Sequence, residues 1–268
     1  MIAGPTLMLG LPLLAAMLAY LLRRWALAAA GVATIVAAWL AWIIWYWSPV
    51  RTIRLWGQWV DMGQPVALLD QQLVLTPAAR PLLAFTSGLA AVCFLYAWRI
   101  SQGRSFFPFG LVLLSLFNGA ALTQPLMRAP LVLAFAAAVA VYIIQAGRPG
   151  SPRGALRWLL FPVLAFPFFL IAAWYLGRVD LNPDDLTPLE MAARLMVYGF
   201  LFLLMAVPFH GAVPALTAEA PPVVSAFLLL SHNGVVLFLL NGLLRSYPWL
   251  VEYYDISRWL LWLSLIHI

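Results

Sequence analysis

The sequence predicts an all-α, polytopic transmembrane helical bundle, and three observations lead to this fold class. The chain has 268 residues, of which 65% are hydrophobic and only 9% are charged. Its mean hydropathy is +0.96. Soluble domains are about half apolar and a quarter charged, so a soluble enzyme, a nucleic-acid-binding protein and a disordered chain are excluded. The apolar stretches are continuous rather than alternating, which disfavours a β-barrel and leaves helices in a lipid bilayer.

Eight apolar stretches approach the roughly 20 residues that a spanning helix needs, and a ninth begins at the end of the sequence. The first ends at Arg23 and Arg24; because these charges follow the apolar stretch, we expect a retained helix rather than a signal peptide. The ninth is about half a span long, so we expect an N-terminal fragment, with a re-entrant or interfacial end as the alternative. The nine stretches are residues 5–22, 25–47, 80–98, 106–124, 130–146, 158–176, 191–209, 222–244 and 259–268.

The connections between these stretches differ in character. Residues 49–77 form the longest polar interruption, and we expect an extramembrane loop there. Residues 179–190 are acidic and end in Thr187 and Glu190, three positions apart, which is the pattern of a capping box at a helix start. Asn118 and Asn241 lie inside apolar stretches and are expected to form interhelical hydrogen bonds.

The basic residues predict the orientation in the membrane. All 15 are Arg, because the chain contains no Lys. Cytoplasmic loops are enriched in basic residues. The loops after the first, third and fifth stretches hold seven Arg and no acid, whereas those after the second, fourth and sixth mix Arg with Asp. We therefore expect the N-terminus outside and the loop at 148–157 in the cytoplasm.

Residues 206–230 are the segment most informative about function. Pro208, Pro214, Pro221 and Pro222 cannot all lie in one regular helix, because each proline removes a backbone donor. Irregular backbone at membrane depth persists only inside protein or beside a wet cavity. A discontinuous helix after the seventh stretch, carrying His210 and Glu219, is the kind of element that transporters use for ion sites. An ordinary loop between two spans is the alternative.

The same segment resembles a known family. The antiporter-like, proton-translocating membrane subunits of respiratory complex I (NADH:quinone oxidoreductase), the Mrp-type cation/proton antiporters and the membrane-bound hydrogenases share a similar signature. An upstream similarity includes Leu68, Leu69 and Asp70. The matching motif residues are Pro208-Phe209-His210, Pro214, Glu219-Ala220-Pro221 and Ser225-Ala226.

This resemblance implies a proton-conducting subunit that couples distant electron transfer to proton translocation. Such subunits hold no cofactor and no catalytic redox centre of their own. The implied partners are the lipid bilayer and other membrane subunits of a redox-driven proton-pumping complex, in a prokaryotic inner membrane. Residues 1–105 would supply the first three spans and a loop, and residues 106–268 a C-terminally truncated antiporter-like domain.

The sequence also departs from the family pattern. The family's proton path uses a Glu in the fifth span and Lys in the seventh and eighth. This chain has no Lys, and the three positions fall near Phe135, on Leu203 and near Asn233. A Leu or Phe cannot titrate. A non-pumping structural subunit of the same kind of complex is therefore the alternative to a pump.

Four residues are candidates for a rewired proton path: His210, Glu219, His232 and Asn233. His210 could transfer protons, as histidine side chains often do, or it could instead anchor the broken helix through a hydrogen bond. Glu219 could pair with a buried Arg, or it could be a solvated loop acid. His232 and Asn233 are polar in the middle of an apolar stretch, where they could relay protons or bridge helices.

An unrelated membrane enzyme is the third hypothesis. Asp180, Asp184 and Asp185 could bind a divalent ion through oxygen ligands, although their spacing matches no established site. The histidines are scattered and Cys93 is the single cysteine, so we predict no metal site and no disulfide. We assign no catalytic residue.

Overall fold

In the computed structural model most of the described residues are helical. The structure describes residues 2–46, 52–55, 57–68, 71–100, 102–103, 105–145, 152–179, 185–206 and 208–252. The helices are α1 (Gly4–Leu21), α2 (Ala26–Tyr46), α3 (Arg80–Arg99), α4 (Phe106–Leu122), α5 (Ala129–Gln145), α6 (Arg153–Val179), α7 (Thr187–Leu203), α8 (Ala212–Glu219), α9 (Pro222–Ser246) and α10 (Trp249–Glu252), with a 3₁₀ turn, η1, at Leu126–Arg128.

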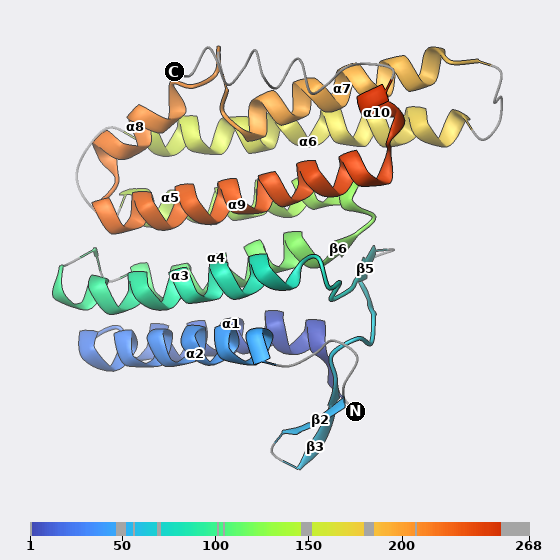
Figure 1. The fold of residues 1–268 in the computed structure, drawn as a ribbon. Coiled ribbons are helices and arrows are strands. Elements are labelled where there is room, and N and C mark those ends of the chain that lie inside the picture. The colour runs from blue at the N-terminus through green and yellow to red at the C-terminus, as the bar shows by residue number, and fades with distance from the viewer. Residues whose placement is uncertain are drawn as a thin grey trace.

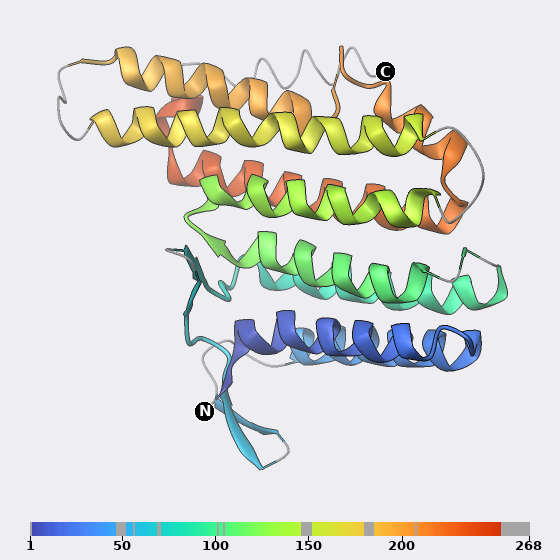
Figure 2. The same cartoon turned by 180° about the vertical axis from the view of Figure 1, so that it is seen from behind.

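The long helices run side by side in two layers (Figure 1). One layer contains α2, α3, α9 and α7, and the other contains α1, α4, α5 and α6, which are seen from behind in Figure 2. Successive helices run in opposite directions, so the α1–α2 turn and the start of α6 lie at the end opposite the strands. Helices from both sides of residue 105 pack into one hydrophobic core, which includes Ala37, Phe94, Phe117 and Leu133.

Among the residues that the structure describes, six helical segments are long and apolar enough to cross a membrane by length and composition, which supports a polytopic membrane protein. These segments are Gly4–Leu21, Ala26–Tyr46, Arg80–Arg99, Leu126–Gln145, Arg153–Val179 and Pro222–Ser246. The count is lower than the eight or nine spans that the sequence predicts. α4 is apolar but shorter, α7 is outside the set, and the predicted ninth span lies outside the described residues.

The predicted extramembrane loop contains short strands rather than irregular chain. β2 (Thr52–Leu55) and β3 (Gln58–Asp61) form an antiparallel hairpin, and β1 (Ile2–Ala3) pairs with β3 in parallel. A second small sheet has the order β4–β5–β6, from Val66–Leu68, Gln71–Leu73 and Thr123–Gln124. Both sheets lie at the end of the bundle that holds the N-terminus (Figure 1).

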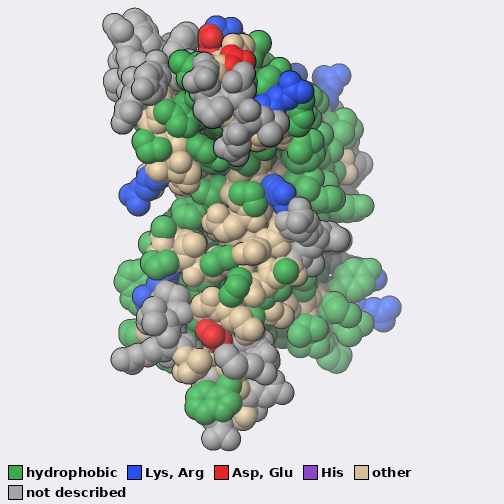
Figure 3. All heavy atoms as spheres, turned by 90° about the vertical axis from the view of Figure 1, so that its right-hand side faces the viewer, with side chains coloured by type: hydrophobic (Ala, Val, Ile, Leu, Met, Phe, Trp, Pro, Cys, Tyr) green, Lys and Arg blue, Asp and Glu red, His purple; other side chains and the backbone are tan. Residues whose placement is uncertain are grey.

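The outer surface is that of a protein in lipid. Large apolar side chains such as Leu21, Trp25 and Ile35 are more than 60% exposed. Seen from the end that carries the strands, hydrophobic side chains gather along the flanks, and acidic and basic side chains lie together at the top of the view (Figure 3). Alanines instead fill the helix contacts, as Ala33 and Ala37 do in α2, because small residues let helices approach closely in lipid.

Arg80 fastens the start of α3 to the end of α2. Its Nε donates a hydrogen bond to the Ile44 carbonyl at 2.7 Å, and its guanidinium also donates to the Trp45 carbonyl. These are among the last carbonyls of α2, which have no partner within the helix. We expect Arg80→Leu to lower the free energy of unfolding in lipid or detergent by about 1.5–3 kcal/mol, the typical contribution of charge-assisted hydrogen bonds.

Arg99→Leu is the matched control, since Arg99 is at the opposite end of the same helix and lies over the Trp98 ring at 4.8 Å. An exposed cation–π contact contributes only about 0.5–1 kcal/mol. Equal losses of stability in the two variants would contradict the role assigned to Arg80.

Candidate functional site

The segment between α7 and α9 leaves the helical path at Leu203. Two hydrogen bonds close the end of α7: Met205 N–H donates to the Phe202 carbonyl at 3.1 Å, and Ala206 N–H donates to the Leu201 carbonyl at 3.0 Å. Met205 has φ +50°, in the left-handed region that usually favours glycine. This geometry is a Schellman-type helix end.

The prolines of this segment occupy positions where no backbone N–H is needed. Pro208 lies in the exposed turn after α7, and Pro214 lies in the first turn of α8. Pro221 is the N-cap of α9 and Pro222 is its first residue. The first N–H groups of a helix have no partner within it, so proline costs little there. The four predicted helix-breaking prolines thus lie outside helix interiors.

His232 is buried inside the bundle and contacts the end of α7. Its Nε2 lies 2.9 Å from the Leu203 carbonyl oxygen, and the residue is 2% exposed. A carbonyl only accepts hydrogen bonds, so Nε2 is the protonated nitrogen and donates. The Trp158 ring of α6 packs edge-to-face on the imidazole, with ring centroids 5.1 Å apart. His232 therefore joins α9 to α7 and α6.

Glu219 caps the start of α6. Its Oε2 accepts a hydrogen bond from Gly154 N–H at 2.7 Å. Gly154 is the second residue of α6, where backbone N–H groups have no helical acceptor and the helix dipole favours negative charge. This contact fixes the C-terminal end of α8 against α6. The sequence leaves open a buried Arg partner or a solvated loop acid for Glu219, and in this contact its partner is a backbone amide.

The structure does not bring the four predicted proton-path residues together. His210 is exposed in the turn before α8. Asn233 follows His232 on α9 but is exposed on the outer surface. Glu219 and His232 are 13 positions apart and have different partners. Of the four, His232 is the residue that lies in the bundle interior.

A second polar group lies between α3 and α4. Thr86 and Asn118 are both buried, with 3.2 Å between the Thr86 hydroxyl oxygen and Asn118 Oδ1. The interhelical hydrogen bond predicted for Asn118 is therefore present. Asn241, in contrast, is exposed on α9.

The acidic connection before α7 shows no ion site among its described residues. The N-cap of α7 is Leu186 rather than the predicted Thr187, which is the first residue of the helix. Asp185, just before the N-cap, accepts a hydrogen bond from Thr187 N–H at 2.9 Å. Hydrogen bonds from the Thr187 side chain and backbone lower the pKa of Asp185. Asp180 and Asp184 lie outside the described residues. Within the part of the chain that the structure describes, no group of three His, Cys, Asp or Glu is arranged to hold a metal.

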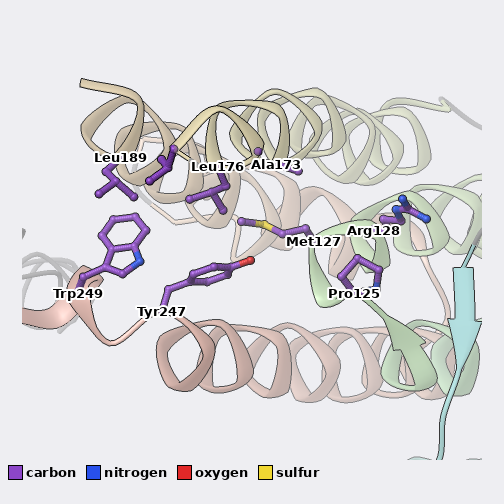
Figure 4. Close-up of a pocket in the computed structure, with 10 residues that line it drawn as sticks. Pro125, Met127, Arg128, Ala173, Leu176, Leu189, Tyr247 and Trp249 are labelled. Carbon is purple, nitrogen blue, oxygen red and sulfur yellow. The ribbon is translucent and has the colours of Figure 1, made fainter. Parts of the chain in front are cut away.

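A cavity of about 500 Å³ lies at the other end of α9, among η1, the last turns of α6 and the start of α7 (Figure 4). Its lining includes apolar side chains and Arg128, and Tyr247 points across it toward Met127. Tyr247 is 15 residues beyond His232 on or beside α9, or about 22 Å at the helical rise. The cavity and His232 are thus separate features.

The comparisons with known proteins add no family. No protein-family model matches the sequence, and no curated protein is significantly similar to it. The fold and composition define a class, an all-α membrane protein with several spanning helices.

Proposed function

We propose that the chain is an antiporter-like membrane subunit of a complex-I-like or hydrogenase-like redox complex, and that His232 is its proton-transfer group. The observation that carries the proposal is the contact between buried His232 and the Leu203 carbonyl at the end of α7. An ionisable side chain buried among spanning helices, at a place where backbone hydrogen bonding is interrupted, is a functional site by default.

The positions of the motif residues support this proposal. Pro208 lies in the turn after α7, Glu219 is the last residue of α8, and Ser225 is in the first turn of α9. In this proposal α4 and α7 also span the membrane, and α7 and α8 are the halves of one discontinuous helix. Leu69 and Asp70 of the upstream similarity lie outside the described residues.

The location of His232 also supports it. The two Lys positions that the resemblance implies fall on Leu203 and near Asn233. His232 precedes Asn233 and contacts Leu203, so an ionisable group occupies the region between the two positions. In the proposed assembly, partner subunits provide electron transfer, and this chain moves protons in a prokaryotic plasma membrane.

The proposed orientation rests on the arginine-rich, acid-free loops of the sequence, because other arginines, such as Arg80, Arg178 and Arg245, lie at the strand end of the bundle. Arg23, Arg24, Arg99, Arg153 and Arg157 lie at the bundle end opposite the strands (Figure 1). We propose that this end faces the cytoplasm and that the N-terminus lies outside.

A non-pumping structural subunit is the second candidate, and one observation favours it. Among the described residues classed as buried, His232 is the only Asp, Glu, Lys, Arg or His. A proton path needs titratable groups or water at short intervals. One histidine would then serve to hold α7, α6 and α9 together.

Redox-driven proton uptake separates these two candidates. The complex would be purified from its native host through a tag on this chain, reconstituted in liposomes and supplied with electron donor and quinone. We expect His232→Gln, which keeps a hydrogen-bond donor but cannot bind and release a proton, to abolish proton uptake while the complex stays assembled. His210→Ala, which removes an exposed histidine in the turn before α8, should pump like the wild type.

Uptake that is unchanged in His232→Gln would refute His232 as the proton-transfer group. A wild-type complex that transfers electrons without proton uptake would favour the structural role. Purification without any redox subunit would contradict the proposed assembly itself.

A further inference from the structure

Three buried polar atoms in the α3–α4–α9 packing have no hydrogen-bond partner: Ser87 Oγ, Asn118 Nδ2 and Ser231 Oγ. All three residues are fully buried, with 0% of their surface exposed. Leaving a buried donor or acceptor unpaired costs about 1–3 kcal/mol. Three such atoms in one packing region therefore indicate a missing polar partner.

The helix register places these atoms at a similar depth. Ser87 follows Thr86, whose hydroxyl oxygen lies 3.2 Å from Asn118 Oδ1. On α9, Phe227 packs on Phe94 of α3, with ring centroids 6.1 Å apart. Further along α9, a Cβ at Gly234 would lie 3.8 Å from the Phe85 ring.

α3 and α9 run antiparallel, so a residue between Phe227 and Gly234 faces one between Phe94 and Phe85 (Figure 1). Ser231 of α9 therefore lies at about the same height along the bundle as Ser87 of α3. Phe117, next to Asn118, also packs on Phe227, with ring centroids 6.2 Å apart. The three helices converge on this level.

We propose that the α3–α4–α9 packing binds internal water at the Asn118 amide, with Ser87 and Ser231 as further partners. The Thr86 hydroxyl has a single hydrogen but two possible acceptors: Asn118 Oδ1 at 3.2 Å and the Leu83 carbonyl oxygen at 3.1 Å. Whichever way the Asn118 amide is turned, one of its two ends lacks a partner. Water can both donate and accept, so it satisfies either end.

A metal cation fits this site less well than water does. The side chains of Thr86, Ser87, Asn118 and Ser231 are all neutral, so no carboxylate offsets the charge of a buried cation. Internal waters in proteins make about three hydrogen bonds to otherwise unpaired polar groups. This inference stands independently of the proposed function, since it concerns hydration and not proton transfer.

Water-to-amide magnetisation transfer by NMR tests the proposal. The chain would be placed in nanodiscs of deuterated lipid and labelled with ¹⁵N at its four asparagines, Asn118, Asn182, Asn233 and Asn241. Asn118→Leu assigns the Asn118 side-chain signal by its loss. We expect transfer from water to the Asn118 side-chain amide, and a several-fold weaker transfer in Ser87→Ala/Ser231→Ala.

Asn233 is the internal control, because it lies two residues from Ser231 on the same helix but is exposed on the outer surface of the bundle. We expect no long-lived water at its amide. An Asn118 amide that receives no magnetisation from water would overturn the proposal. Equal transfer to Asn118 and Asn233 would also overturn it, because that pattern means general water penetration. Transfer unchanged in the double serine variant would remove Ser87 and Ser231 from the site.

Discussion

Gly154→Ala is expected to destabilise the protein by about 3 kcal/mol, although the same change in an open helix position usually stabilises. A Cβ at Gly154 would lie 2.5 Å from the Ala215 carbonyl oxygen and 2.7 Å from Glu219 Oε2. The first contact is with backbone, which cannot rotate away. α8 must therefore move off α6, and the hydrogen bond between Gly154 N–H and Glu219 is lost. Thermal unfolding in detergent, followed by circular dichroism, measures the change.

Gly177→Ala is the matched control on the same helix. A Cβ there meets no atom within 4 Å. Replacing this helical glycine should leave stability unchanged or raise it by up to about 1 kcal/mol. The two substitutions are chemically identical, so opposite signs would isolate the close approach of α8. A Gly154→Ala variant as stable as Gly177→Ala would show that α8 is not held against α6.

A double variant identifies the contact further. Glu219→Ala alone removes the N-terminal cap of α6. Because both changes break the same hydrogen bond, the losses of stability in Gly154→Ala and Glu219→Ala should sum to more than the loss in the double variant. Additive losses would mean that the carboxylate and the glycine act independently.

The fold class and the helix positions follow from apolar continuity in the sequence. α3 begins at Arg80, as predicted, and α9 begins at Pro222, as predicted. The seventh apolar stretch was expected to reach residue 209, yet α7 ends at Leu203. Hydropathy does not report where backbone hydrogen bonds stop, and the left-handed Met205 carries no sequence signal because glycine is the usual residue there.

The candidate site was predictable only in part. His232 was singled out because it is polar within an apolar stretch, and the structure places it in the interior. Its two partners could not be predicted: the Leu203 contact is with a backbone carbonyl, which any residue type provides, and Trp158 looks like an interfacial aromatic in the sequence. The exposure of Asn233 depends on the rotation of α9 about its axis, which packing mainly against α3, α4 and α5 decides.

His232→Ala is expected to lower the free energy of unfolding by about 3–5 kcal/mol. Most of this loss should come from the cavity beside Trp158, because hydrogen bonds between membrane helices contribute on average only about 0.6 kcal/mol. The remainder comes from the Leu203 carbonyl oxygen, which loses the hydrogen bond from His232. This carbonyl is at the end of α7, where the helix provides no backbone N–H to replace it. Asn233→Ala, one residue further on but exposed, should change stability by no more than about 0.5 kcal/mol.

Comparing His232→Ala with His232→Gln then separates packing from proton transfer. Gln keeps a side-chain N–H that can reach the Leu203 carbonyl and fills part of the space against Trp158, so it should recover part of the lost stability. If proton uptake is lost in both variants while stability recovers in His232→Gln, the imidazole is needed for its titration. If uptake and stability instead recover together, His232 acts as the hydrogen-bonded link between α7 and α9, and the bundle conducts protons without it.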